Sequence, residues 1–467
     1  MAVRFSEDQV VKATGAHRVQ SGSAASYTSV ATDTRTLLPG ALFVALAGER
    51  YDAHEFLKDA VARGARGAVV KEGRKLPPLP RDFGLFAVPD TLLALGALAR
   101  FHRARFKIPV GAVTGSNGKT TTKEMAGAIL ATRGPALKTE GNLNNEVGVP
   151  LTLFRLEPSH VAAAIEMGMN RPGEIGRLTA IAQPDAGLIT VVQAAHLEGL
   201  GSLEGVAAAK GELFHGLSQH GTAVVNLDDP LIVAQAAQAK RRTLSFGKAA
   251  GADVRLSSVA ARGRDGLSLE IDHQGRRHAV KLAFVGEHNA HNAAAAFALG
   301  RALGYSAEEC VMGLQAARPH PRRLNVVPAP GGVTVLDDCY NANPASMGAA
   351  LDALAGLAKG GRAVAVLGDM LELGEDAARE HAALGLRAAG STQLLALFGP
   401  RSVEGYARAR VKLGGAVAHF TEVEPLLEWL RPQLREGDVV LVKGSRGMRL
   451  ERVVDALAGQ PAAGGGH

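Results

Sequence analysis

Short apolar runs alternate with amphipathic helical patterns along most of this chain, which is typical of an α/β protein. In the first hundred residues the pattern predicts strands at 41–46 and 68–70 and helices at 54–63 and 91–106. The second helix begins beside Asp90 or Thr91, either of which can cap it. Further strand–helix units, with strands at 161–165, 186–192 and 222–226, predict a mainly parallel central sheet.

The remainder of the chain carries two more patterns. Short alternating runs separated by glycine turns at 252–282 predict a β-rich excursion, and a polar Pro-containing segment around 317–324 predicts a linker. Beyond it, strands at 333–336, 363–367, 393–398 and 438–442 alternate with helices, as in a doubly wound sheet. We therefore predict three α/β domains: a small one at 1–106, a central one at 107–318 and a Rossmann-like one at 319–467, whose residues 460–467 form a flexible tail.

The most informative segment is 110–124, where an apolar strand gives way to a glycine-rich turn that opens a helix. Gly115 and Gly118 permit a tight turn whose backbone N–H groups point inward and bind anions. Lys119 is placed to reach terminal phosphates and the Thr120 hydroxyl to coordinate Mg²⁺. Val113 stands where the longer motif has its first glycine, so this is a shortened P-loop. It predicts a nucleoside triphosphate site formed by Thr114, Gly115, Ser116, Asn117, Gly118, Lys119, Thr120 and Thr121.

Composition narrows the class of protein. The 467 residues are 46% hydrophobic, without an apolar run of about 20 residues or the apolar core of a signal peptide, so we expect no membrane span. Two cysteines, Cys310 and Cys339, argue against a disulfide framework and fit a reducing compartment such as the cytoplasm. The net charge of +7 is scattered, without interleaved aromatic residues, which favours phosphorylated small molecules over nucleic acid.

Several polar residues stand where strands end. Glu166 follows the strand at 161–165, and a carboxylate near a P-loop suits Mg²⁺. His196 follows the strand at 186–192, and Lys210 lies on the next helix; alone, such residues are usually packed or solvated, and only their position suggests a role. Asn289 opens a helix, where a cap is the simpler interpretation and a base contact the alternative.

Other polar clusters fit a ligand or a plain turn. Loops at 32–35 and 48–54 could hold a polar nucleotide, or could serve only as turns and caps. Clusters at 337–344 and 443–446 follow strands of the third domain, where open α/β sheets bind ligands. Cys339 has no neighbouring histidine in sequence, so we interpret it as an inert thiol.

Taken together, these motifs resemble those of the Mur ligases, the ATP-dependent amide-forming enzymes of peptidoglycan synthesis. The resemblance covers nearly the whole chain: 114–120 matches the family's shortened P-loop and 286–289 its adenine-contacting His-Asn element. Segments 144–152, 195–202 and 337–344 are similar to the member that adds D-alanyl-D-alanine. Segments 33–35, 42–45 and 48–50 resemble a UDP-binding domain shared with the preceding ligase, whose diamino-acid motif we do not find.

The resemblance implies an activity and a role for each site residue. The chain is expected to join D-alanyl-D-alanine to the terminal carboxylate of UDP-N-acetylmuramoyl-tripeptide through an acyl phosphate, as a monomer with ATP and two Mg²⁺ ions. Lys119 would bind the β- and γ-phosphates, Thr120 and Glu166 one Mg²⁺, and His196 the other, beside Lys210, which matches a lysine carbamoylated in sibling ligases. Asn289 would contact adenine, Asp338 the ribose and Arg323 the γ-phosphate. The candidates for substrate contacts are Thr34, Arg35, Gly48, Asp52, Asn144, Asn145, Asn341, Asn343, Lys443 and Ser445.

The resemblance also predicts domain closure about a hinge at 319–321, since the ligands come from three domains. Three alternatives share the P-loop. A diamino-acid-adding sibling and a folylpolyglutamate synthase-like ligase belong to the same superfamily, and the N-terminal domain weighs against the second. An NTP-driven switch or nucleic-acid motor would leave 338–344 and 443–446 without a role.

Overall fold

The N-terminal part of the chain folds around a five-stranded sheet in the computed structural model, which describes residues 4–48, 51–193 and 200–459. The strand order is β1-β5-β4-β3-β2, and β1 runs antiparallel to β5 while the others are parallel. These elements are β1 (His17–Gln20), β2 (Ser29–Ala31), β3 (Ala41–Val44), β4 (Gly67–Lys71), β5 (Gly84–Val88), α1 (Glu7–Thr14), α2 (Leu57–Ala62) and α3 (Thr91–Arg103). Asp90 caps α3, as expected, by accepting from the N–H groups of Leu92 and Leu93.

The central sheet has nine strands in the order β14-β13-β12-β11-β10-β9-β6-β8-β7. It is parallel from β7 to β12, and β12, β13 and β14 form an antiparallel end, which is the predicted β-rich excursion. The strands are β6 (Val110–Thr114), β7 (Ala136–Lys138), β8 (Ala162–Glu166), β9 (Ala186–Ile189), β10 (Thr222–Asn226), β11 (Arg242–Gly247), β12 (Val254–Ala261), β13 (Leu267–His273) and β14 (Arg276–Leu282). The helices are α4 (Lys119–Leu130), α5 (Gly148–Leu153), α6 (Glu174–Ala182), α8 (Leu203–Gly216), α9 (Pro230–Ala239), α10 (His288–Ala302) and α11 (Ala307–Ala316).

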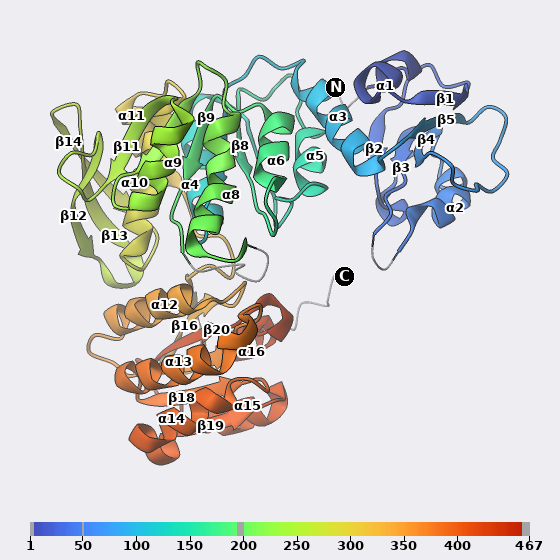
Figure 1. Ribbon diagram of the computed structural model, residues 1–467. Coiled ribbons are helices and arrows are strands. Elements are labelled where there is room, and N and C mark those ends of the chain that lie inside the picture. The colour runs from blue at the N-terminus through green and yellow to red at the C-terminus, as the bar shows by residue number, and fades with distance from the viewer. Residues whose placement is uncertain (1–3, 49–50, 194–199, 460–467) are drawn as a thin grey trace.

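The C-terminal sheet has the order β15-β16-β20-β17-β18-β19, parallel except for the edge strand β15. Its strands are β15 (Asn325–Pro328), β16 (Thr334–Asp338), β17 (Ala363–Gly368), β18 (Leu394–Phe398), β19 (Val417–Phe420) and β20 (Val439–Lys443). Its helices are α12 (Pro344–Leu357), α13 (Ala377–Ser391), α14 (Val403–Leu413), α15 (Val423–Leu430) and α16 (Glu451–Ala458). Figure 1 shows the three sheets as separate units, with the central one between the other two.

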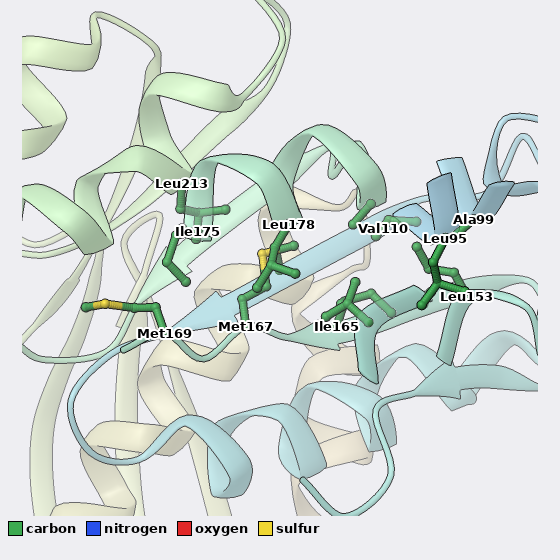
Figure 2. Packing of buried hydrophobic residues seen from close by; sticks show 14 of the residues in the cluster. Leu95, Ala99, Val110, Leu153, Ile165, Met167, Met169, Ile175, Leu178 and Leu213 are labelled. Atoms are coloured by element: carbon green, nitrogen blue, oxygen red, sulfur yellow. The ribbon is translucent and has the colours of Figure 1, made fainter. Parts of the chain in front are cut away.

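Helix α3 joins the N-terminal and central sheets through one hydrophobic core. Leu95 and Ala99 of α3 belong to the same cluster of buried side chains as Leu153 of α5 and Val110 of β6 (Figure 2). The same cluster extends to buried residues of the N-terminal sheet such as Val44. Burying apolar area in one continuous cluster stabilises the two units as a single body.

The predicted fold class is confirmed, since all three sheets are of the expected α/β kind. The sheets fall within the three predicted segments, and the boundary residues near 106 and 318 stay predictions. The expected tail at 460–467 lies outside the described residues. Within the described part of the chain, no helix is both long and apolar enough to cross a bilayer.

Candidate active site

The P-loop connects β6 to α4 with the backbone path that its glycines predict. Gly115 and Gly118 have φ values of +147° and +80°, which side-chain-bearing residues rarely adopt. A Cβ atom on Gly115 would lie 1.9 Å from the Thr190 hydroxyl oxygen. That hydroxyl donates to the Asn117 carbonyl at 2.6 Å, so the neighbouring strand's end fixes the loop.

The Lys119 ammonium lies over this loop and donates to the carbonyl oxygen of Gly115 at 2.7 Å. Burial lowers the pKa of Lys119; the Glu166 carboxylate opposes that shift and the Arg323 cation adds to it. Lys119, Glu166 and Arg323 therefore share one electrostatic environment, although they come from three distant segments.

Glu166, the last residue of β8, is buried beside the P-loop strand, with Val113 as its register partner. Its Oε1 accepts from the Asn144 amide at 2.8 Å, while its buried Oε2 has no hydrogen-bond partner among the described residues. A buried, unpartnered carboxylate oxygen close enough to Lys119 to act on its pKa fits a hard cation such as Mg²⁺. No group of three or more His, Cys, Asp or Glu residues able to hold a metal occurs within the described residues.

Lys210 lies on α8 and is only 2% exposed. Burial, with a smaller contribution from the Lys119 charge, lowers the pKa of Lys210 well below that of a free lysine. A lower pKa favours the neutral form of the amine, which is the form that reacts with carbon dioxide. His196, its expected neighbour at the second metal, lies outside the described residues.

A cavity of about 710 Å³ extends from the P-loop toward α10 and β16. Asn289 lines it and is held by its own contacts: its amide donates to the Val285 carbonyl at 2.8 Å, and its carbonyl oxygen accepts from Asn292 at 2.9 Å. The N-cap position of α10 belongs to Glu287 instead, so the interpretation of Asn289 as a helix cap is wrong. Asp338 lines the same cavity.

Arg323 enters the site from the linker with its backbone constrained on both sides. Arg322 and Leu324 have φ values of +65° and +49°, in the left-handed region that non-glycine residues avoid. The Leu324 N–H donates to Asp338 Oδ1 at 3.1 Å. The guanidinium lies 4.0 Å from the centroid of the Tyr340 ring, and its Nη2 is 3.4 Å from the Thr120 hydroxyl oxygen. The linker arginine therefore reaches the helix end that carries the predicted magnesium ligand.

Asp338 and Lys443 end neighbouring parallel strands and are register partners, so their side chains meet. Lys443 Nζ donates to Asp338 Oδ2 at 2.5 Å and to the Asn341 carbonyl at 3.0 Å, and both side chains are buried. Lys443 is therefore engaged inside the C-terminal unit rather than pointing freely at a substrate.

A second cavity, of about 900 Å³, lies between the P-loop and the loops that follow β16, β17 and β20. Three predicted substrate residues, Asn341, Asn343 and Ser445, line it together with Lys119 and Arg323. The Asn343 side-chain amide also donates to Asn117 Oδ1 at 2.9 Å, which ties the start of α12 to the P-loop. The structure thus brings the triphosphate residues and part of the substrate set into one cleft.

Of the other predicted substrate residues, Lys443 lines the cavity of about 710 Å³, and the remaining six line neither cavity. Asn144 supports Glu166, and Asn145 accepts from the N–H of Gly148 at 2.8 Å at the start of α5. In the N-terminal unit, Arg35 pairs with Asp33, next to Thr34. Asp52 pairs with His54 and Arg74, and the Gly48 N–H donates to the Tyr51 carbonyl. Thr34, Arg35, Gly48 and Asp52 line neither cavity of the cleft.

Sequence reasoning missed several residues that the cavities contain. Asp228, just after β10, lines the cavity of about 710 Å³ and accepts from the His291 ring at 3.1 Å. Gln193 lines the same cavity and contacts the P-loop through Asn117. Arg446 lines the larger cavity within the 443–446 cluster. Asp228 could have been predicted from the sequence, because it is a carboxylate that closely follows the end of a strand. Tyr340 lies within the predicted 337–344 cluster, but its contact with Arg323 is formed only by the fold.

The chain is similar over most of its length to proteins of a known family. The family described as Mur ligase middle domain matches residues 113–300, and the Mur ligase glutamate ligase domain matches 322–446. UDP-N-acetylmuramoyl-tripeptide–D-alanyl-D-alanine ligase of Escherichia coli (strain K12) is 40% identical over 435 residues, 92% of this chain and 93% of that protein. A crystal structure of MurF from Acinetobacter baumannii has a TM-score of 0.89 at 33% identity, covering 98% of this chain and all of that one. MurF ligase from Thermotoga maritima in complex with ADP has a TM-score of 0.81 at 30% identity, covering 92% and 97%.

Proposed function

The chain belongs to the Mur ligase family, and from that membership and the geometry of the cleft we propose that it joins D-alanyl-D-alanine to UDP-N-acetylmuramoyl-tripeptide at the expense of ATP. The observation that carries the proposal is the cavity of about 900 Å³ in which Lys119 and Arg323 face the loops of the C-terminal sheet. A switch or motor would not need that second set of loops. Relatives 33–40% identical over most of the chain, all named as D-alanyl-D-alanine ligases, favour this activity over the two sibling ligases.

The chemistry requires activation of an acid. A carboxylate does not react with an amine at neutral pH, because its oxygen is a poor leaving group. In the proposed reaction the terminal carboxylate of the tripeptide attacks the γ-phosphorus of ATP and ADP leaves. The dipeptide amine then attacks the resulting acyl phosphate, and phosphate leaves as the C–N bond forms and a proton is lost. The protein supplies placement and neutralisation of negative charge.

Each cation has a part in this scheme. Lys119 lies at the P-loop, where it would bind the β- and γ-phosphates, and Arg323 would bind the γ-phosphate from the linker. Asn289 and Asp338 would contact adenine and ribose in the cavity of about 710 Å³. Mg²⁺, when bound, would neutralise phosphate charge, and Thr120 and Glu166 are the residues that would hold it.

Lys210 suits carbamoylation, the modification expected at this position. Its buried amine, whose pKa is lowered, can in its neutral form add to carbon dioxide with loss of one proton, giving a carboxylate-like group that would serve a second Mg²⁺ together with His196. Mass spectrometry of the intact protein in bicarbonate would detect the added mass of carbon dioxide. A Lys210→Ala variant should lack that added mass.

The N-terminal sheet would bind the UDP end of the tripeptide substrate through Thr34, Arg35, Gly48 and Asp52. We also propose a cytoplasmic location, which suits two buried cysteines without a disulfide and an ATP-dependent reaction. Burial and the Asp337 carboxylate raise the pKa of Cys339, in agreement with an inert thiol. A monomeric state stays a prediction.

The function is tested by mixing the protein with ATP, D-alanyl-D-alanine and tripeptide substrates carrying lysine or diaminopimelate. Phosphate release should need both peptide partners, and product mass should match the pentapeptide. Labelled oxygen in the tripeptide carboxylate should appear in released phosphate. Phosphate release with ATP alone would favour a switch or motor and would refute the proposal.

The Lys119→Ala variant separates phosphate transfer at the P-loop from binding of the UDP substrate by the N-terminal unit. It should abolish phosphate release while UDP-substrate binding, measured by calorimetry, stays within about twofold of the unchanged protein. Lys58→Ala, at an exposed lysine of the N-terminal unit that lines neither cavity, is the control and should retain activity. Equal loss of binding and turnover in Lys119→Ala would contradict the assignment of the UDP end to the N-terminal sheet.

A further inference from the structure

The incoming dipeptide carries a carboxylate that the residues assigned so far leave without a partner. Its amine must reach the acyl phosphate beside the P-loop. Its carboxylate is at the other end of the two residues, roughly 7 Å from the amine in an extended chain. A carboxylate in a protein cleft needs a cation with hydrogen-bond donors. Lys443, a sequence candidate for this substrate, is already bound to Asp338 and does not line the cavity of about 900 Å³.

Among the described residues, four basic side chains line that cavity: Lys119, Arg323, Arg379 and Arg446. The first two lie at the phosphate end. Arg379 lies on α13 and is paired with Asp376 and Glu380, each at 3.1 Å, so two carboxylates surround one guanidinium. That trio carries a net negative charge and would repel another carboxylate.

Around Arg446 the net charge has the opposite sign to that around Arg379. Arg446 follows β20 and lines the cavity, its side chain is 55% exposed, and its Nη1 donates to Glu451 Oε1 at 2.8 Å. The same Glu451 oxygen lies 3.6 Å from Nη1 of Arg322, so one carboxylate serves two guanidinium groups and the trio is net positive. Within the described residues only one of the five N–H donors of Arg446 has a hydrogen-bond partner. An arginine with free donors can hold a carboxylate through two parallel hydrogen bonds.

We propose that Arg446 binds the C-terminal carboxylate of the incoming dipeptide and so selects a substrate that ends in a free acid. The inference rests on the proposed function, because it assigns a substrate group within the same cleft. Arg446 would fix the far end of the dipeptide while the amine points toward the P-loop. An amide-capped dipeptide would lose this contact without losing its nucleophile.

The test pairs a variant of the protein with a variant of the substrate. Arg446→Gln and Arg446→Lys are compared with the unchanged protein on D-alanyl-D-alanine and on D-alanyl-D-alaninamide. Charge-assisted bonds of this kind give roughly 10- to 100-fold in binding. The unchanged protein should therefore prefer the acid in kcat/KM by that factor. Arg446→Gln should lose most of the preference through a higher KM for the acid, with KM for ATP and for the UDP substrate unchanged. Arg446→Lys should retain part of it.

Arg379→Ala is the matched control, because it removes a cation from the same cavity and should keep the full preference for the acid. The inference is overturned if Arg446→Gln still prefers the acid, if it weakens acid and amide equally, or if it raises KM for the tripeptide instead. A protein that ligates neither dipeptide would refute the proposed function itself. Equal melting temperatures of the variants would show that the fold is kept.

Discussion

Tyr340 offers a direct test of how the linker arginine is held. Replacing it with leucine removes the aromatic face beneath the Arg323 guanidinium and keeps an apolar side chain of similar bulk. Replacing it with phenylalanine keeps the face and removes only the hydroxyl. The two variants therefore separate the ring from the rest of the side chain.

The size of the effect follows from the geometry. The guanidinium carbon lies 4.0 Å from the ring centroid, well inside the range of a cation–π contact. Arg323 is partly buried and its buried Nε has no hydrogen-bond partner among the described residues, so the contact is poorly solvated. We take about 1–2 kcal/mol for it, which corresponds to a roughly 5- to 30-fold lower rate if all of it is lost from the transition state.

The assay is a single turnover of ADP formation with saturating ATP and UDP-tripeptide, followed by steady-state kcat and KM. Tyr340→Leu should lower the rate by the stated factor with little change in the KM for ATP, and Tyr340→Phe should stay within about twofold of the unchanged protein. In an Arg323→Ala background, Tyr340→Leu should cost almost nothing more. Equal losses in the leucine and phenylalanine variants, or an undiminished loss without Arg323, would refute the positioning role.

Three other predictions concern parts of the site and its support. Gly115→Ala should weaken ATP binding roughly 100-fold or more in calorimetry, because its Cβ would lie 1.9 Å from the Thr190 hydroxyl at a φ of +147°; unchanged affinity would contradict the loop geometry. Asp338→Asn should destabilise the C-terminal unit by about 3–5 kcal/mol in urea unfolding, since Lys443 stays buried and unpaired, and adding Lys443→Met should restore most of the loss. Burial lowers the pKa of His102 to about 4, so this residue is neutral when folded, and its stabilising contribution is complete above pH 6.5. That contribution is lost as the pH falls toward 4, by roughly 3 kcal/mol, and a His102→Gln variant that unfolds with the same pH slope would contradict it.

Much of the fold and the P-loop could be predicted because their signals are local. The glycine spacing around Lys119, the apolar run of β6 and the helix formers of α4 adjoin one another in sequence, and Glu166 ends a strand that the pattern itself shows. Short or polar edge strands such as β7, with three residues, and β1 carry too little periodicity to be recognised. Their pairing depends on neighbouring strands rather than on their own residues.

The contacts that complete the site depend on tertiary structure. Asp338 and Lys443 are 105 residues apart and meet only because β16 and β20 pair in one register. Asn289 looked like a cap because it opens α10, yet its side chain instead bonds Val285 and Asn292. Arg446 belongs to the predicted 443–446 cluster, but its pairing with a carboxylate shared with Arg322 is formed only by the fold.

The shared core around α3 has a consequence for the length of the peptide substrate that the site can accept. Leu95 and Ala99 fuse the N-terminal sheet to the sheet that carries the P-loop (Figure 2), so these two units cannot change their spacing freely. With the UDP end anchored as proposed, this packing would hold the distance from the UDP end to the γ-phosphate nearly constant, and the predicted closure would then move the C-terminal unit. The length of the peptide would then decide whether its terminal carboxylate reaches the γ-phosphate. A peptide one residue shorter would fail to reach it, whatever its side chains.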